Sequence, residues 1–370
     1  MPELTPREAL ITLNLIPGLG SIRIQALLEH FGSAELALAA PAAMLQQVPR
    51  IGPAQAAAIA DWQSCTNVFA EMEAAESLGV RMVTLQDAEY PAALRRMADP
   101  PVVLYVRGAW QECDSVHGVA IVGTRRATPY GVTVARKFAR ELADAGCTIV
   151  SGLARGIDTA AHTGALDAGG RTIAVAGFGL ADLYPPENAE LVERMLDGHG
   201  ALVSEFPLYM RANRNTFPQR NRIVAAWSRA TLVVEAPAHS GALHTARLAA
   251  DHYGSNVFAV PGAVTQTSSA GCHQLIRDGA ILCTSPHELM EDMGWGEPRQ
   301  LGLFDREPSQ ADLPDSPESA LIAALRAGHD TLDALCSALG MGAGEITPML
   351  MRLQVQRRIQ TQSGGRFSAV

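Results

Sequence analysis

The sequence contains a single lysine, Lys137, so nearly all of its positive charge is carried by arginine. An arginine side chain presents a planar fork of N–H donors that can contact a phosphate with two hydrogen bonds, whereas a lysine ammonium acts as a point charge. A codon bias would produce the same excess, and the composition leaves both explanations open. Because the lone lysine lies within a helical segment, a P-loop of the G-x-x-x-x-G-K-[ST] type is excluded, and with it ATP hydrolysis of that kind.

Long apolar runs and patterned cysteines are also missing. No run of about 18 or more apolar residues occurs, and the N-terminus, with Glu3, Arg7 and Glu8, lacks the layout of a signal peptide. We therefore expect a cytoplasmic protein without membrane association. The cysteines show no C-x-x-C spacing and the histidines form no H-E-x-x-H motif, which argues against zinc, any other metal, or a disulfide framework. We expect no cofactor.

Charge is unevenly distributed along the chain. The net charge of −9 argues against a protein coated in positive potential. Residues 115–140 and 206–234 nevertheless contain no Asp or Glu and are rich in cations. We expect a localised basic groove on an acidic body. The cations are Arg125, Arg126, Arg136, Lys137 and Arg140 in the first window and Arg211, Arg214, Arg220, Arg222 and Arg229 in the second.

The 370 residues are enough for two to four domains. We expect a helical domain over residues 1–78, an extended Rossmann-like domain over 79–293, a linker over 294–317 and a small domain over 318–370. In the first of these, residues 15–20 and 48–53 each place glycines before a helical segment, a repeat that resembles tandem helix-hairpin-helix (SAM-like) motifs. Such turns let backbone N–H groups contact a DNA phosphate. A plain helical bundle is the alternative.

Short β-branched runs alternate with helical segments through the middle of the chain. This pattern predicts an α/β fold with a mostly parallel, Rossmann-like sheet and helices on both faces. Ligands of such sheets bind at the carboxyl ends of the strands. The predicted strands are residues 81–85, 102–106, 119–122, 148–150, 172–175, 201–203, 231–234, 256–260 and 280–283.

Four motifs at the predicted strand ends combine small residues, helix starts and arginines. Small residues let the backbone approach an anion, N–H groups at a helix start face it, and arginine adds charge. We therefore expect four loops to converge on one edge of the sheet and to hold a phosphate-bearing polymer. The motifs are Gly123-Thr-Arg-Arg126, Ser151-Gly-Leu-Ala-Arg-Gly-Ile-Asp158, Asn215-Thr-Phe-Pro-Gln-Arg-Asn-Arg-Ile223 and Val234-Glu-Ala-Pro-Ala-His-Ser-Gly-Ala-Leu-His-Thr-Ala246.

Two carboxylates beside these motifs, Asp158 and Glu235, are placed for acid–base work. The structural alternatives are a first-turn carboxylate favoured by the helix dipole for Asp158 and a strand-end acceptor that orients Arg220 or Arg222 for Glu235. We favour the structural alternatives, because neither carboxylate has a nucleophile near it in sequence. We predict no catalytic residues and a protein that is not an enzyme.

The C-terminal residues resemble a winged helix. Helical segments over 320–327, 332–339 and 345–356 are followed by short strands at 358–362 and 366–368 around Gly364-Gly365. The third helix carries only Arg352 as a cation, which is little for a helix that reads a DNA groove. We therefore favour a protein-interaction role over duplex recognition.

The motifs between residues 119 and 284 together resemble the bacterial DNA-processing protein A (DprA/Smf) family. The resemblance implies a non-catalytic, single-stranded DNA-binding protein of natural transformation (competence). Such a protein protects incoming single strands, loads the RecA recombinase onto them for recombination, and works as a homodimer through the Rossmann-like domain. The matching residues are Ile121-Val-Gly-Thr-Arg125, Ser151 to Asp158, Phe217-Pro-x-Arg-Asn-Arg-Ile223, Val234-Glu-Ala236, Ser240-Gly241 and Val257-Phe-Ala-Val-Pro-Gly262.

The resemblance also implies roles for individual residues. Arg125 clamps a phosphate, Phe217 stacks on a base or lies in the core, and Arg214 is proposed from its charge alone. Ser240 and Gly241 form a second anion site. The first anion pocket comprises Ser151, Gly152, Arg155 and Gly156, and the groove is lined by Phe217, Arg220, Asn221 and Arg222.

Two other functions stay open at this point. A nucleotide-processing enzyme of the related phosphoribohydrolase-like group shares the Rossmann-like fold, but its P-G-G-x-G-T-x-x-E loop is replaced here by residues 236–246, which contain no Glu. A pure protein-protein adaptor would leave the basic windows as solvated faces and would not bind DNA in a salt-dependent way.

Overall fold

The computed structural model describes residues 4–295, 320, 321, 324, 325, 329–355, 359–362 and 366–369. The chain forms two compact units, Met1–Pro298 and Arg299–Val370. Nearly all of the predicted linker, residues 294–317, lies outside the described residues. The predicted bounds of the four segments therefore stay predictions.

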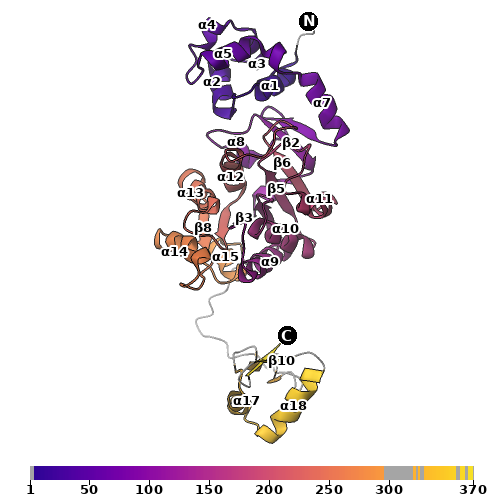
Figure 1. Ribbon diagram of the computed structural model, residues 1–370, viewed down its shortest axis with the longest axis vertical. Coiled ribbons are helices and arrows are strands. Elements are labelled where there is room, and N and C mark those ends of the chain that lie inside the picture. Colours follow the sequence, from indigo (N-terminus) through magenta and orange to yellow (C-terminus); the bar gives the residue numbers. More distant parts are fainter. Residues whose placement is uncertain are drawn as a thin grey trace. The chain divides into compact units, whose positions relative to one another are not determined.

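Short helices build the N-terminal part of the first unit (Figure 1). Thr5 begins the first helix with a capping box, in which its hydroxyl accepts from the Glu8 N–H and the Glu8 carboxylate accepts from the Thr5 N–H. Gly20 and Gly52 precede α2 and α5, the two helices that the glycine repeat predicted. The helices are α1 (Pro6–Leu15), α2 (Ser21–Phe31), α3 (Ala34–Ala39), α4 (Ala42–Leu45), α5 (Pro53–Ala60), α6 (Trp62–Cys65) and α7 (Val68–Ser77).

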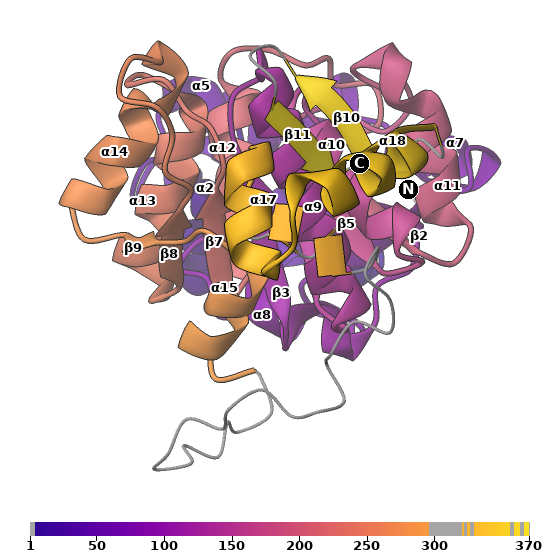
Figure 2. The ribbon, with the colours of Figure 1, turned by 90° about the horizontal axis from the view of Figure 1, so that it is seen from below.

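A nine-stranded sheet forms the centre of the first unit, in the order β1-β2-β6-β5-β4-β3-β7-β8-β9. In Figure 2 the strands can be followed across the sheet from β9 and β8 through β7 and β3 to β5 and β2. The neighbouring strands in the spatial order β6-β5-β4-β3-β7-β8-β9 all pair in parallel. Strand β2 pairs antiparallel with both β1 and β6. The predicted mostly parallel α/β fold is confirmed. The strands are β1 (Arg81–Thr84), β2 (Val103–Gly108), β3 (Gly118–Val122), β4 (Thr148–Ser151), β5 (Thr172–Ala176), β6 (Gly200–Ser204), β7 (Ala230–Val233), β8 (Asn256–Ala259) and β9 (Ile281–Leu282).

Helices cover both faces of this sheet because alternate side chains of each strand point to opposite sides. Val119 and Ile121 of β3 pack with α9 (Pro129–Asp144), α10 (Ile157–Asp167) and α15 (Pro286–Asp292). Ala120 and Val122 belong to the opposite layer. That layer contains α8 (Ala92–Arg95), α12 (Thr216–Trp227), α13 (Gly241–Tyr253) and α14 (Ala270–Arg277). Strands buried on both faces are typical of parallel sheets.

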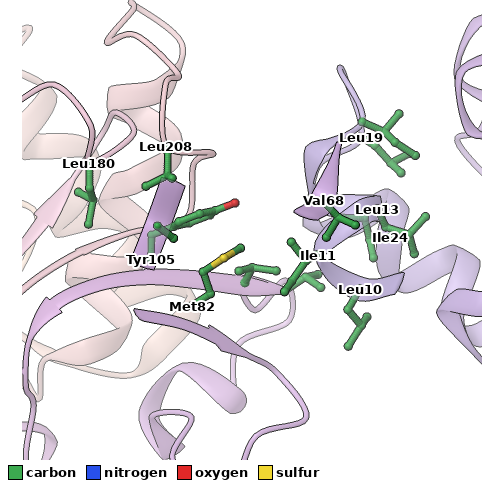
Figure 3. Packing of buried hydrophobic residues seen from close by; sticks show 14 of the residues in the cluster. Leu10, Ile11, Leu13, Leu19, Ile24, Val68, Met82, Tyr105, Leu180 and Leu208 are labelled. Atoms are coloured by element: carbon green, nitrogen blue, oxygen red, sulfur yellow. The ribbon is translucent and has the colours of Figure 1, made fainter. Parts of the chain in front are cut away.

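The N-terminal helices share a hydrophobic core with one edge of the sheet. Met82 of β1 and Tyr105 of β2 lie between helix α1, which carries Leu10 and Ile11, and the loops that carry Leu180 and Leu208 (Figure 3). The cluster continues into α11 (Ala189–Leu196). A hydrogen bond from the Leu208 N–H to the Glu71 carboxylate, 2.8 Å long, adds a polar tie between α7 and the sheet domain.

The chain reverses its direction across the sheet at β3. From β3 it proceeds through β4, β5 and β6 on one side, and then β7, β8 and β9 are added on the other side. The Thr124 N–H, just after β3, donates to the Glu235 carbonyl, just after β7, at 2.7 Å. A crevice at the carboxyl ends of the strands beside such a reversal is the usual ligand site of an open α/β sheet.

The C-terminal unit contains α17 (Leu332–Leu339), α18 (Ala343–Val355) and a hairpin of β10 (Ile359–Gln362) and β11 (Arg366–Ala369). Its core includes Leu335, Ile346, Leu350 and Ile359. Residues 320, 321, 324 and 325 of the predicted first helix are helical, and the rest of that helix and the Gly364-Gly365 turn lie outside the described residues.

In the part of the chain that the structure describes, no single helix is long and apolar enough to cross a membrane. One pair, Leu332–Leu339 with Ala343–Gln354, meets the length and composition requirement only when taken together, across a bend of 112°.

Candidate nucleic-acid interface

A cavity of about 290 Å³ lies at the carboxyl ends of β3, β4 and β7, where the chain reverses across the sheet. The starts of α12 and α13 close it on one side. Seven of the predicted site residues line it: Arg125, Gly152, Phe217, Arg220, Asn221, Ser240 and Gly241. Segments that are far apart in the sequence thus meet at one place.

The position of Asn215–Ile223 differs from the prediction. The sequence placed this motif directly at a strand end, in a loop that opens a helix. The structure has residues 205–215 between β6 and α12, and the motif itself forms the first turns of α12. Phe217 and Arg220 therefore reach the cavity from a helix, which fixes their directions more firmly than a loop does.

An arginine and a phenylalanine form one part of the cavity wall. The guanidinium carbon of Arg125 lies 4.3 Å from the ring centroid of Phe217, a cation–π contact. Arg125 is exposed and Phe217 is half-buried. A Cβ on Gly177 would lie 2.9 Å from the Phe217 ring, so only a glycine lets the ring settle over that backbone.

Arg220 is a buried cation in the same wall. It is 3% exposed, and its Nη1 donates to the carbonyls of Gly152 and Val175, at the ends of β4 and β5. Burial lowers the pKa of the guanidinium to about 10, so it stays charged at neutral pH. A Cβ on Gly152 would lie 2.5 Å from the guanidinium, and this close approach explains the glycine. Arg220 thus ties α12 to the loop after β4.

The carboxyl group of Asp158 lies inside the predicted anion pocket. Its Oδ2 accepts hydrogen bonds from the N–H groups of Gly152 at 3.2 Å and Ala154 at 3.3 Å. Burial raises the pKa of Asp158, and Arg220 together with the two N–H groups opposes that rise. The sequence predicts that these loop N–H groups bind a phosphate. In the structure they donate instead to a side chain of the same chain, Asp158.

The other residues of that pocket have distinct positions. Ser151 is fully buried and its hydroxyl donates to the Ile121 carbonyl at 2.6 Å, beneath the cavity floor. Gly156 has a φ of +80°, and a Cβ there would collide with the Thr124 carbonyl, so it allows the helix α10 to start against the β3 loop. Arg155 is exposed, and its Nε and Nη2 donate to the two carboxylate oxygens of Glu187.

Two more of the predicted arginines, besides Arg155, do not line the cavity. Arg222 is buried and forms ion pairs with Asp99 at 3.0 Å and Glu205 at 2.5 Å. It also donates to Ser21, which joins α12 to the N-terminal helices. Arg214 is exposed and does not line the cavity.

The start of α13 supplies an open helix N-terminus at the cavity. The Ser240 hydroxyl accepts from the Ala242 N–H at 3.3 Å, as an N-cap residue does. Gly241 is exposed, and no atom lies within 4 Å of the place a Cβ would occupy. Asn221 reaches the Gly241 carbonyl from α12. The backbone there is accessible to an incoming group.

Glu235 does not orient Arg220 or Arg222, so that sequence-based interpretation was wrong. Its Oε2 accepts from the Thr128 N–H at 2.9 Å and from the Thr128 hydroxyl at 3.2 Å. The carboxylate therefore holds the loop between β3 and α9 in place.

His162, one of the histidines near the motifs, is a packing residue. It is fully buried, and its Nδ1 lies 2.6 Å from the Thr172 hydroxyl. Burial lowers its pKa to about 3, so the imidazole is neutral. Within the described residues, no group of three or more His, Cys, Asp or Glu could hold a metal ion.

Comparison with known proteins decides the family. Residues 81–294 match the model of the DNA recombination-mediator protein A family, and residues 305–365 match the DprA winged helix domain. The chain belongs to the DNA recombination-mediator protein A family. The winged-helix expectation for the C-terminal residues is likewise confirmed.

Relatives and solved structures from several bacteria agree with this assignment. Protein Smf of Synechocystis is 32% identical over 95% of this chain and 96% of its own length, and Protein Smf of Escherichia coli is 38% identical over 75% and 74%. DNA processing protein A of Streptococcus pneumoniae covers 78% of this chain and 98% of its own at 32% identity, with a TM-score of 0.66. The Helicobacter pylori DNA processing protein A, whose structure reports a single-stranded DNA binding mode, covers 58% and 97% at 31% identity, with a TM-score of 0.52.

Sequence reasoning missed two residues at the rim of the site, Tyr184 and Glu187. They lie in the long connection after β5, which carries no glycine-rich motif beyond Gly177 and Gly179. The sequence Tyr184-Pro-Pro186, with a rigid turn that presents an aromatic ring, was the available signal.

Proposed function

We propose that this protein binds single-stranded DNA in natural transformation, protects the incoming strand, and loads RecA onto it as a homodimer. The observation that carries the DNA-binding part is the cavity beside β3, where the strand order changes direction. There the Arg125 guanidinium lies over the Phe217 ring, beside the open start of α13. The Helicobacter pylori relative with its single-stranded DNA binding mode supports the same class of ligand.

The geometry suits a single strand for two reasons. A phosphate can contact the Arg125 guanidinium and the exposed backbone at Gly241, where the helix dipole favours an anion. The arginine plane laid on the Phe217 ring offers a flat surface on which an unpaired base can stack. Paired bases in a duplex do not present these faces, so the mode favours single strands with little sequence preference.

The first test is the affinity for an oligothymidylate and for a duplex of equal length across a salt series. We expect tighter binding of the single strand, with a slope of log affinity against log salt of about −0.7 for each phosphate contacted. Arg125→Ala should weaken binding about tenfold or more and make the slope shallower. Arg96→Ala removes an exposed arginine that does not line the cavity, and it should bind as the wild type does.

Absence of binding by the wild type at low salt would refute the DNA-binding proposal, and nucleotide hydrolysis would then be assayed. The proposal gives the cavity no chemical step. If the chain binds another protein in a salt-independent way and does not bind DNA, the adaptor function would be favoured instead.

Protection, RecA loading and dimerisation need separate measurements. Bound oligonucleotide should resist a single-strand nuclease, and Arg125→Ala should abolish that resistance. RecA loading should shorten the lag of DNA-dependent ATP hydrolysis by RecA on strands coated with a single-strand-binding protein. Light scattering should give twice the 39.2 kDa mass of the chain. An unchanged lag, or a monomeric mass across micromolar concentrations, would remove the corresponding part of the proposal.

A further inference from the structure

A second, smaller hollow of about 30 Å³ adjoins the cavity across the Arg125 and Phe217 side chains. It shares Arg125, Gly152, Ala154 and Phe217 with the cavity, and its far wall is formed by Arg155, Phe178 and Tyr184. Building on the proposed function, we propose that Tyr184 forms a second nucleobase subsite, next in line after Phe217. A base that follows the one at Phe217 stacks on the Tyr184 ring.

The aromatic side chains form a series that leads away from the cavity. The ring centroids of Phe217 and Tyr184 are 6.3 Å apart with planes inclined by 45°, and those of Tyr184 and Phe178 are 6.3 Å apart at 81°. Phe178 is buried and supports the edge of the tyrosine ring. Tyr184 itself is 41% exposed, so a large part of its ring is free to take a partner.

Cations accompany the rings along this series. The guanidinium of Arg125 lies on Phe217 at 4.3 Å, and that of Arg155 lies 6.0 Å from the Tyr184 centroid. A single strand alternates phosphates and bases, so a repeated arginine-and-aromatic unit fits two successive nucleotides. A docked protein helix would need an apolar groove, whereas this hollow carries two arginines.

The Tyr184 ring is positioned before DNA arrives. Tyr184 precedes Pro185, which restricts its backbone to extended conformations. Asn188 is buried and donates to the Leu153 carbonyl at 3.0 Å, which anchors the connection after β5 to the loop after β4. A pre-positioned ring loses little conformational entropy on binding, which favours affinity.

The test compares Tyr184→Leu, Tyr184→Phe and the wild type for binding of an oligothymidylate across a salt series. Removing the ring should weaken binding about 5- to 10-fold, at the lower end of the effect of losing a stacked base, because leucine keeps some apolar contact. Since no charge changes, the salt slope should stay that of the wild type. Tyr184→Phe should bind within about twofold of the wild type, because stacking needs the ring and not the hydroxyl.

Tyr209→Leu is the matched control, because Tyr209 is 64% exposed and lines neither hollow. It should bind as the wild type does. A cross-linking experiment on the wild-type protein does not depend on whether a variant folds. An oligonucleotide that carries one 5-iodouracil should cross-link to Tyr184 as well as to Phe217 on irradiation. Peptide mass mapping identifies the residue that carries the adduct.

The outcomes separate this subsite from the proposed function. Wild-type affinity in Tyr184→Leu, or adducts at Phe217 without any at Tyr184, overturns the subsite and leaves single-strand binding intact. A shallower salt slope in Tyr184→Leu also overturns it, because the tyrosine would then act through Arg155 on a phosphate. If the wild type does not bind the oligonucleotide at low salt, the proposed function and the subsite both fail.

Discussion

The guanidinium of Arg125 lies 4.3 Å from the centre of the Phe217 ring, and this contact joins the loop after β3 to the first turn of α12. A cation over an aromatic face contributes about 0.5–2 kcal/mol, depending on how far it is removed from water. Both side chains line the cavity. The position that each side chain offers to a DNA strand therefore depends on the presence of the other side chain.

This dependence predicts non-additive effects on DNA binding. Arg125→Ala and Phe217→Leu should each weaken oligothymidylate binding, and the double variant should lose less than the sum of the two losses by about 0.5–1 kcal/mol. The measurement is a double-mutant cycle of dissociation constants at one salt concentration. Strict additivity would show that the two side chains act independently on the strand.

The Glu187 carboxylate holds Arg155 where a phosphate is proposed to bind. The ion pair with Arg155 lowers the pKa of Glu187, so the carboxylate is charged at neutral pH and competes with an incoming anion. We expect Glu187→Gln to tighten oligothymidylate binding about threefold and to add about one phosphate contact, or about 0.7, to the salt slope.

Glu190→Gln removes the same charge from an exposed position in the first turn of α11, three residues away, and serves as the control. It should change affinity by less than Glu187→Gln and leave the slope unaltered. Equal effects of the two variants would mean that only the net charge matters and that the ion pair does not compete with DNA.

Asp158 is expected to stabilise the fold as well as the loop after β4. Asp158→Asn replaces the buried carboxyl group and weakens the hydrogen bonds from the Gly152 and Ala154 N–H groups. Weakening these two buried hydrogen bonds should cost about 1–3 kcal/mol of unfolding free energy, measured by urea denaturation at pH 7. Asp182→Asn, at an exposed position in the connection after β5, should cost less than about 0.5 kcal/mol. A similar loss in both variants would contradict the role of Asp158.

His162 should make stability depend on pH. Burial lowers its pKa to about 3 in the folded state, whereas an unfolded chain has an ordinary value of about 6.5. The unfolded state therefore binds a proton more readily between these values, so this contribution to stability is present above pH 6.5 and is lost as the pH falls. At pH 5 the loss is about 2 kcal/mol.

The measurement is the difference in unfolding free energy between the wild type and His162→Gln at pH 7.5 and pH 5. The difference should shift by about 2 kcal/mol in favour of the variant at the lower pH. Comparing the two chains cancels the opposite effect of Asp158 and Glu205, whose pKa values are raised by burial. Parallel pH profiles would show that His162 does not titrate differently in the two states.

Local sequence patterns were sufficient to predict the sheet. The nine predicted strands correspond to β1–β9, with ends that differ by at most two residues, because β-branched runs between glycines and helical segments mark buried strands. The strand-end position of Arg125 and Gly152 followed from the same pattern. Hydrophobic periodicity is a local property, so the sequence displays it directly.

Partners of the charged residues could not be predicted in the same way. The window of residues 206–234 contains no acid, yet Arg222 forms ion pairs with Asp99 and Glu205. Arg220 donates to the backbone carbonyls of Gly152 and Val175. A charge-poor window in sequence says nothing about acids that folding brings from elsewhere. Glu235 likewise binds Thr128, more than a hundred residues away, and neither of the expected arginines.

The sequence by itself determined the alternation of strands and helices, the glycines at the strand ends and the family resemblance, because each depends on neighbouring residues along the chain. Tertiary structure alone decided which groups face the cavity. Folding buries Ser151 and Arg222 and places Tyr184 beside Phe217. It also brings Asp158 to the loop after β4, where its carboxyl group accepts hydrogen bonds from the loop N–H groups. The physical reason is that burial, ion pairing and ring contacts depend on distances between segments, and only the packing of α12 and the connecting loops onto the sheet fixes those distances.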